Sequence, residues 1–327
     1  MKPVHRVFKP GTSTATVPGT RVVASGDCDV GSADLRRAAI YARPMDFGAL
    51  IFLTDLSIRP DRLATELEDR GFESLWVTEH THIPVSRRTP WPGGAELPEE
   101  YRRTLDPYVA LTAAATVTQR LRLGTGISLV AQHDPIVLAK TVASLDVLSD
   151  GRVLFGIGVG WNVEEMEDHG VDPKRRRSMA REKVLAMREL WTKDEASFDG
   201  EFVNFPPAWS WPKPVSSPHP PIVMGGAGGP ITFRHVVEFC DGWMPIHGRR
   251  GIADKLGDLR RAADEAGRDM NTIELGVFGC PPDAKVIDDY AGWGFSRCAL
   301  IVPPTGEDAA LRALDEYSAL IASYAPA

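Results

Sequence analysis

The chain has 327 residues, of which 43% are hydrophobic and 25% charged, and its formal net charge is −7. These values indicate a soluble globular protein with an ample core, and they argue against nucleic acid or an anionic membrane as its main partner. No segment approaches the roughly 18 apolar residues of a membrane-spanning helix. The cysteines lie far apart, which favours reduced, buried thiols of a cytoplasmic protein over disulfides or a zinc site. They are Cys28, Cys240, Cys280 and Cys298.

The first 44 residues differ in composition from the rest of the chain. They are rich in Thr, Ser, Gly, Pro and Val and show no sustained helical period. They also lack the continuous apolar stretch of a secretory signal. We therefore expect a disordered N-terminal extension over residues 1–44 and one domain over residues 45–327, with a lid or dimer arm as the alternative role for the extension.

From residue 45 onward, strand-like and helix-like patterns alternate. Short apolar runs predict buried strands at residues 47–53, 73–77, 121–127, 153–158, 221–224, 242–245, 273–278 and 298–302. Helical patterns cover residues 59–70, 106–118, 135–148, 172–191, 231–239, 252–266, 284–293 and 307–322. This alternation predicts the α/β class and a closed (β/α)8 TIM barrel. An open doubly wound sheet is less favoured because the first strand–helix turn, residues 53–57, lacks the glycines of a dinucleotide-binding turn.

Two connections are longer than the predicted barrel needs. Residues 78–104 follow the second strand and contain Trp91 and Tyr101, whereas residues 194–220 contain tryptophans and a hairpin-like turn at residues 198–202. We expect both to be long loop insertions that project from the carboxyl face of the barrel or its edge. Loops of this length are usually functional or disordered, so an ordered aromatic wall and plain loop packing are both open.

The ends of the predicted strands carry the candidate site residues, because ligands of parallel barrels bind at the carboxyl ends of the strands. The run Gly225–Gly229 follows a strand and precedes a helix. It indicates either a phosphate-binding turn or a flexible turn. Trp161 and Asn162 follow the fourth strand, where an indole can pack on a planar heterocycle and an amide can hold its edge. The alternative is that Trp161 only fills the rim of the barrel.

Charged residues near these strand ends are further candidates. His80 and His82 form an HxH pair, which binds metal in some barrels but needs further ligands, and His247 is the only obvious one. We expect no metal, a hydrogen-bonding or proton-transfer role for His80, and a loop position for His82. Asp172 is a natural N-cap for the helix that runs to Trp191. The basic cluster at residues 174–177 is either a solvated face or the source of one phosphate-binding arginine.

Several of these segments carry a family resemblance. They are Trp76–His80, Gly124–Ile127, Asp134-Pro135, Leu145–Arg152, Gly156–Asn162 and Gly225-Gly226. Together they resemble the luciferase-like monooxygenase superfamily, and they are most similar to its branch of F420-dependent oxidoreductases. The resemblance covers residues 45 to at least 243 and extends more loosely to the end of the chain.

The resemblance implies a (β/α)8 barrel that binds the deazaflavin coenzyme F420, or alternatively FMN, at its carboxyl face. Glu79 and His80 would be the catalytic residues beside the deazaflavin ring, and Gly126-Ile127 would form a cis peptide bond against the ring. The cofactor-binding residues would then be Gly126, Ile127, Gly158, Gly160, Trp161, Asn162, Gly225 and Gly226.

The reaction implied by the resemblance is hydride transfer between F420 and an unidentified small organic substrate. His80 is the leading proton donor or acceptor, and Glu79 either orients His80 or acts as the acid itself. Relatives that oxidise glucose 6-phosphate carry Asp-His in place of Glu79-His80 and Glu in place of Trp161, so a sugar-phosphate substrate is not supported. An FMN-dependent monooxygenase, a non-catalytic coenzyme-binding homologue and a metal-dependent hydrolase are the alternatives, and a homodimer is left open.

Overall fold

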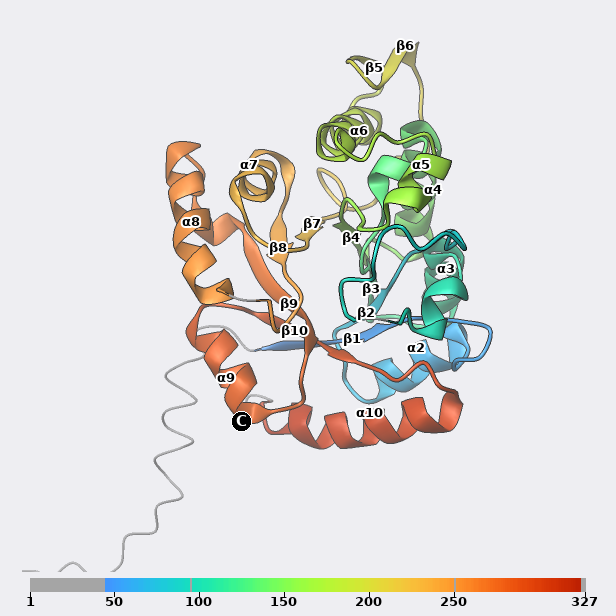
Figure 1. Cartoon of the computed structure of the whole chain (residues 1–327), viewed down its shortest axis with the longest axis vertical. Helices are drawn as coiled ribbons and strands as arrows, with labels where there is room; N and C mark the ends of the chain where they lie inside the picture. The colour runs from blue at the N-terminus through green and yellow to red at the C-terminus, as the bar shows by residue number, and fades with distance from the viewer. Residues whose placement is uncertain (1–44, 95, 250, 325–327) are drawn as a thin grey trace, which may run out of the picture. The chain divides into compact units, whose positions relative to one another are not determined.

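The computed structural model describes residues 45–94, 96–249 and 251–324 of the chain. In them, eight parallel strands close a barrel in the order β1-β10-β9-β8-β7-β4-β3-β2 (Figure 1). These strands are β1 (Asp46–Ile51), β2 (Ser74–Val77), β3 (Arg122–Thr125), β4 (Val153–Ile157), β7 (Ile222–Gly225), β8 (Gly242–Met244), β9 (Glu274–Cys280) and β10 (Arg297–Ile301). The predicted TIM barrel is confirmed, whereas the expected extension over residues 1–44 lies outside the described residues.

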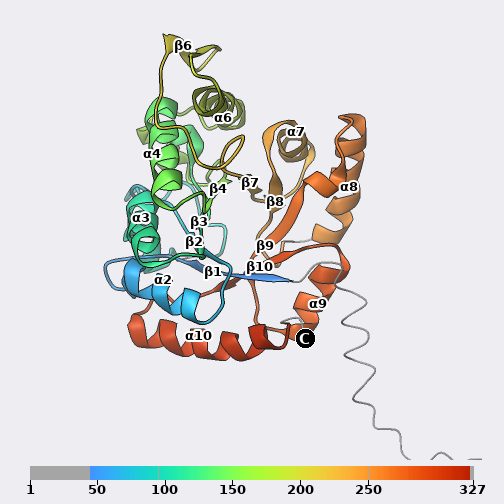
Figure 2. The ribbon, with the colours of Figure 1, turned by 180° about the vertical axis from the view of Figure 1, so that it is seen from behind.

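Helices surround the barrel and connect successive strands, as Figures 1 and 2 show from opposite sides. They are α2 (Pro60–Asp69), α3 (Pro107–Val117), α4 (Pro135–Leu148), α5 (Val163–Asp168), α6 (Arg176–Thr192), α7 (Pro230–Phe239), α8 (Ile252–Glu265), α9 (Ala284–Gly292) and α10 (Glu307–Ala322). Within the described residues, no helix is long and apolar enough to span a membrane.

Local sequence explains where several helices begin. Asp106 and Asp134 each precede a proline, and their carboxylates accept hydrogen bonds from backbone N–H groups in the first turns of α3 and α4. Such caps satisfy N–H groups that have no partner within the helix. The expectation that Asp172 caps α6 is wrong, because α6 begins at Arg176 and Asp172 closes the preceding turn through the N–H group of Lys174.

The barrel interior is filled by apolar side chains below the carboxyl ends of the strands. Trp76 is fully buried there, and its indole N–H donates to the Ser74 hydroxyl at 2.9 Å. A Cβ atom on Gly124 would lie 2.4 Å from the Trp76 ring, so glycine at this position makes room for the indole. Ile127 packs against the same interior cluster from above. The floor of the carboxyl end is therefore a packed core and not a channel.

The two long connections lie at different ends of the barrel. Residues 78–104 extend from the carboxyl end of β2, as predicted, and contain a short 3-10 helix, η1 (Glu99–Arg102). The predicted hairpin is confirmed as β5 (Ala196–Asp199) and β6 (Asn204–Ala208), which pack on α6. However, residues 194–220 join a helix to a strand and so return to the amino end of the barrel. The expected insertion at the carboxyl face is therefore wrong for this second connection.

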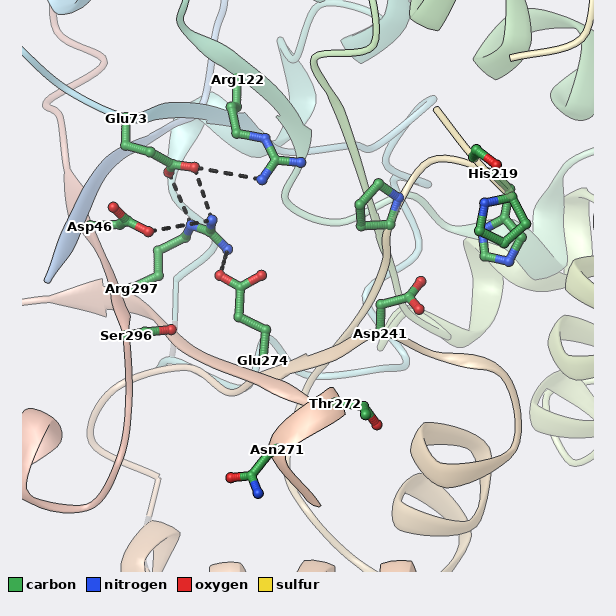
Figure 3. Close-up of a pocket in the computed structure, with 13 residues that line it drawn as sticks. Asp46, Glu73, Arg122, His219, Asp241, Asn271, Thr272, Glu274, Ser296 and Arg297 are labelled. Atoms are coloured by element: carbon green, nitrogen blue, oxygen red, sulfur yellow. Dashed lines mark hydrogen bonds and ion pairs between the residues drawn. The ribbon is translucent and has the colours of Figure 1, made fainter. Parts of the chain in front are cut away.

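A polar cavity of about 560 Å³ lies at the amino end of the barrel (Figure 3). The Arg297 guanidinium lies 2.9 Å from a Glu73 carboxylate oxygen and 2.5 Å from one of Glu274. Asp46 and Arg122 lie at the edge of this network. The amino end is thus closed by ion pairs between the first residues of the strands.

Candidate active site

The end of β2 places His80 against the short helix α5. His80 Nδ1 lies 2.8 Å from Glu165 Oε2, and the Thr81 backbone N–H donates to Glu165 Oε1 at 3.2 Å. The two side chains of the pair are only 6% and 1% exposed. Glu165 therefore fixes the imidazole ring and leaves Nε2 as the atom that can face a substrate. Glu165 therefore orients His80, which is one of the two roles that the sequence left open for Glu79.

Glu79 points to a different part of the barrel end. Its Oε1 lies 2.7 Å from His133 Nε2, and its Oε2 accepts the Leu129 backbone N–H. Burial lowers the pKa of His133, but the hydrogen bond and charge of Glu79 outweigh this and raise it. Glu79 thus ties β2 to the segment that follows Ile127. Its role as a catalytic acid stays a prediction.

The peptide bond between Gly126 and Ile127 is cis, as the family resemblance implied. The Ile127 side chain rests on two of the glycines assigned to the cofactor. A Cβ atom on Gly158 would lie 1.8 Å from Ile127 Cδ1, and one on Gly225 would lie 2.6 Å from Ile127 Cγ2. These two glycines therefore make room for Ile127. Their direct contact with a cofactor stays a prediction.

At Gly160 and Gly226, the backbone conformation requires glycine. Their φ angles are +72° and +92°, a region that other residues rarely adopt. A Cβ atom on Gly226 would have no neighbour within 4 Å. The turn after β7 therefore exposes backbone to open space, as a ligand-binding turn requires.

Aromatic side chains from three segments meet at the predicted mouth of the site. The ring centres of His80 and Tyr101 are 5.3 Å apart, those of His80 and Trp161 are 6.0 Å apart, and Trp91 packs on Tyr101 at 5.8 Å. Trp91 folds over Gly93, where a Cβ atom would lie 2.3 Å from its ring. Residues 78–104 thus form an ordered aromatic wall, which was one of the two interpretations of this loop.

Three buried side chains at this end of the barrel have polar atoms without a hydrogen-bond partner within the described residues. They are the Thr78 hydroxyl, both amide atoms of Gln132, and Asn162 Nδ2. Asn162 is 1% exposed, and its Oδ1 accepts the Glu165 N–H at 3.4 Å. Buried polar groups are nearly always paired, so unpaired ones indicate a missing partner. Donors and acceptors together suit the polar edge of a flavin or deazaflavin ring, so the residues present fit such a group.

A second polar region lies at the start of α7. Arg177 Nη1 donates to the Thr232 hydroxyl at 3.3 Å, and that hydroxyl donates to the Ala227 carbonyl oxygen at 3.3 Å. Burial and the neighbouring Arg176 lower the pKa of Arg177. Arg177 has no ion pair with a described residue, whereas Arg176 donates to the Pro173 carbonyl oxygen. The free N–H groups of a helix start and the unneutralised guanidinium group of Arg177 favour an anion.

The histidines that could have formed a metal site are held apart. His82 Nε2 lies 3.0 Å from Asp168 Oδ2, whereas His247 Nδ1 lies 3.0 Å from the Tyr290 hydroxyl. Across residues 45–94, 96–249 and 251–324, no group of three or more His, Cys, Asp or Glu side chains could hold a metal ion. His82 is a half-exposed loop residue, as predicted.

Sequence reasoning missed Glu165 and His133 as the partners of His80 and Glu79. Their spacing of 85 and 54 residues along the chain carries no local signal. Asn162 and Glu165 do stand at the N-cap and third positions of α5, a spacing that indicates a helix start. That pattern predicts α5 but not its contact with His80.

A known protein family and several known proteins are similar to this chain. The family model described as luciferase-like monooxygenase matches residues 60–282. The chain belongs to this family. An uncharacterized protein of Mycobacterium tuberculosis is 42% identical over 281 residues, which cover 85% of this chain and 99% of the relative.

One further relative and one solved structure are similar to this chain. The F420-dependent hydroxymycolic acid dehydrogenase of Mycobacterium tuberculosis is 25% identical over 269 residues, covering 80% of this chain and 70% of that protein. The crystal structure of the monooxygenase RslO1 from Streptomyces bottropensis superposes with a TM-score of 0.71 at 23% identity, covering 86% of this chain and all of that one. The latter likeness shows the fold alone.

Proposed function

We propose that this protein is an oxidoreductase that transfers a hydride between coenzyme F420 and a small organic substrate at the carboxyl end of the barrel. The observation that carries the proposal is a set of buried polar atoms without a partner within the described residues. They belong to Gln132, which lies beside Gly160, and to Asn162, which contacts Glu165 of the His80–Glu165 pair. The similarity to an F420-dependent dehydrogenase supports the choice of coenzyme.

When bound, the coenzyme supplies or accepts the hydride. The residues of this chain then position the reacting groups, exclude water from them and move the proton that balances the hydride. Gln132 and Asn162 would hold the edge of the ring, and Ile127 would support its face. Because Glu165 holds Nδ1 of His80, the proton that balances the hydride would move at Nε2. Trp161 and Tyr101 would exclude water from the reacting atoms.

The start of α7 would hold the phosphate of the coenzyme. Gly226 and Gly229 leave backbone open to space, and Arg177 adds positive charge through its contact with Thr232. This assignment combines the glycine turn and the basic cluster that the sequence offered as separate candidates. Gly225, in contrast, serves mainly to seat Ile127.

A parallel binding titration with F420 and FMN, followed by fluorescence quenching, tests the proposal. We expect micromolar or tighter binding of F420 and much weaker binding of FMN. A preference for FMN would support a monooxygenase that uses molecular oxygen, which is the second candidate because the family model is described as luciferase-like monooxygenase. Binding of neither would contradict the proposal and favour a non-catalytic homologue.

We also propose that the protein forms a homodimer through α3 and α4. The sequence of α3 contains no charged residue, yet Val109 on it is 70% exposed. On α4, Val137 is 64% and Leu148 63% exposed. A helix that is apolar on all sides is normally buried, so this face lacks its partner surface. Because the face is almost uncharged, it suits a second copy of itself better than a charged partner.

Light scattering on the purified protein measures this directly. We expect the mass of a dimer, and we expect Val137→Glu to give a monomer because the substitution buries an unpaired charge at a symmetric contact. Val85 is 96% exposed and lies on another segment, so Val85→Glu is the matched control and should stay dimeric. A monomeric wild type would contradict this proposal.

A further inference from the structure

A buried glutamate of α5, Glu164, holds the middle of the loop of residues 78–104. Glu164 Oε1 accepts the Thr89 backbone N–H at 3.0 Å, and Glu164 Oε2 accepts the Thr89 hydroxyl. The Thr89 hydroxyl oxygen in turn lies 3.4 Å from the Val163 backbone nitrogen. The Glu164 side chain is only 5% exposed. A buried carboxylate that accepts two hydrogen bonds from one residue fixes that residue firmly.

The carboxylate of Glu164 is charged in this contact. Desolvation raises its pKa, but the hydrogen bonds from Thr89 outweigh this and lower the pKa of Glu164 to about 2. The Glu164 carboxylate therefore stays charged well below neutral pH. A second loop contact, between Arg88 and Glu167, is solvent-exposed on both sides. Exposed ion pairs of this kind contribute little to stability.

Adjacent glutamates of α5 thus hold two different parts of the site. Glu165 holds His80 at the end of β2, whereas Glu164 holds Thr89 in the loop. Thr89 is two residues before Trp91, whose ring packs on Tyr101 and, through it, on His80. The position of the aromatic wall relative to the imidazole is therefore set within one turn of one helix.

We infer that Glu164 is a positioning residue, which acts through Thr89 to hold Trp91 and Tyr101 against the His80 side of the site. The hydrogen bonds that define this role are independent of any coenzyme. Its consequence for ligand binding rests on the proposed function. Glu164 is not among the site residues predicted from the sequence.

Hydrogen exchange of the backbone amides in residues 85–94 tests the anchoring. In Glu164→Ala, we expect exchange in this segment to rise about tenfold or more, because hydrogen bonds to a charged group are lost. Glu164→Gln retains one acceptor oxygen and should be intermediate. Glu167→Ala, on the same helix, is the matched control and should change exchange by about twofold or less.

Equal exchange in wild type and Glu164→Ala, or no rescue by Glu164→Gln, would overturn the inference. If Glu164→Ala does not fold, Thr89→Val provides the same test, because it removes the hydroxyl and keeps the backbone N–H. Exchange in Thr89→Val should rise above that of wild type, and wild-type exchange would overturn the inference.

The release rate of F420 tests the consequence for the site. We expect release to be several-fold faster from Glu164→Ala than from wild type, and unchanged in Glu167→Ala. Faster exchange with unchanged release would overturn the role at the site. If wild type does not bind F420, the proposed function fails, whereas the exchange experiment still decides whether Glu164 positions the loop.

Discussion

The two ends of the barrel differ in how their polar groups are satisfied. At the amino end, the 2% exposed Arg297 is neutralised by Glu73 and Glu274 (Figure 3). At the carboxyl end, Gln132 and Asn162 are buried with unpaired atoms. The amino end is therefore complete as it stands, whereas the carboxyl end has polar groups that only a ligand or water would satisfy. Barrels in general separate stability and function in this way.

The largest expected effect is a loss of turnover at the carboxyl end of the barrel. His80→Gln should lower turnover of an identified substrate by about 10²–10⁴-fold, because a positioned proton donor is lost. Its affinity for F420 should stay within a few fold of wild type. Glu165→Gln should lose less activity and shift the pH profile, since the imidazole keeps its place but loses its charged partner. Unchanged turnover in His80→Gln would remove His80 from the mechanism.

At the amino end, the expected effect is on stability. Arg297→Leu leaves the Glu73 and Glu274 carboxylates without their buried partner, so we expect the free energy of unfolding to fall by about 3–5 kcal/mol. Urea unfolding measures it. Lys285 forms an exposed pair with Asp289, and Lys285→Ala is the control, with a loss of about 1 kcal/mol or less. Loss of F420 affinity in a folded Arg297→Leu variant would contradict the separation of stability at the amino end from coenzyme binding at the carboxyl end.

Crowding Ile127 should affect binding more than folding. Gly158→Ala places a Cβ atom on the end of the Ile127 side chain, which can move, so we expect only a modest loss of stability. The displaced side chain should lower F420 affinity by about tenfold. Gly292→Ala, at the last residue of α9, is the control because its Cβ atom would meet nothing within 4 Å. Its F420 affinity should match wild type and its stability should not fall.

The smallest predicted effect is a pH dependence at the amino end. Burial and the nearby Glu73 carboxylate raise the pKa of Asp46 to about 6. Because this folded-state value lies above the unfolded value of about 3.9, ionisation of Asp46 destabilises the fold as the pH rises from about 4 to 6. Asp46→Asn should therefore gain stability relative to wild type over this range. The side chain is 43% exposed, so the gain should be small.

The barrel was predictable because its signals are local. Apolar runs of strand length, prolines after Asp106 and Asp134, and glycines at strand ends each follow from neighbouring residues. The range predicted for the helix at residues 135–148 agrees with α4. The predicted helix at residues 172–191 and the predicted strand at residues 221–224 already place residues 194–220 at the amino end, because a helix-to-strand connection of a (β/α)8 barrel lies there. The expectation of the carboxyl face was therefore wrong for a reason visible in the sequence.

The site was predictable only in outline. The sequence placed His80 and Trp161 at strand ends, and their rings do lie near each other. It did not reveal that Glu165, rather than Glu79, holds His80, because that contact joins residues 85 positions apart. Nor did it reveal that Gly158 makes room for Ile127, which depends on the path of the neighbouring strand.

The central claim is that the carboxyl end of the barrel, and not the polar cavity at the amino end, binds the coenzyme. A titration of F420 against Gly158→Ala and Asp46→Asn, side by side with wild type, tests it most directly. We expect micromolar or tighter binding to wild type and Asp46→Asn, and about tenfold weaker binding to Gly158→Ala. Weaker binding to Asp46→Asn with full affinity in Gly158→Ala would contradict it.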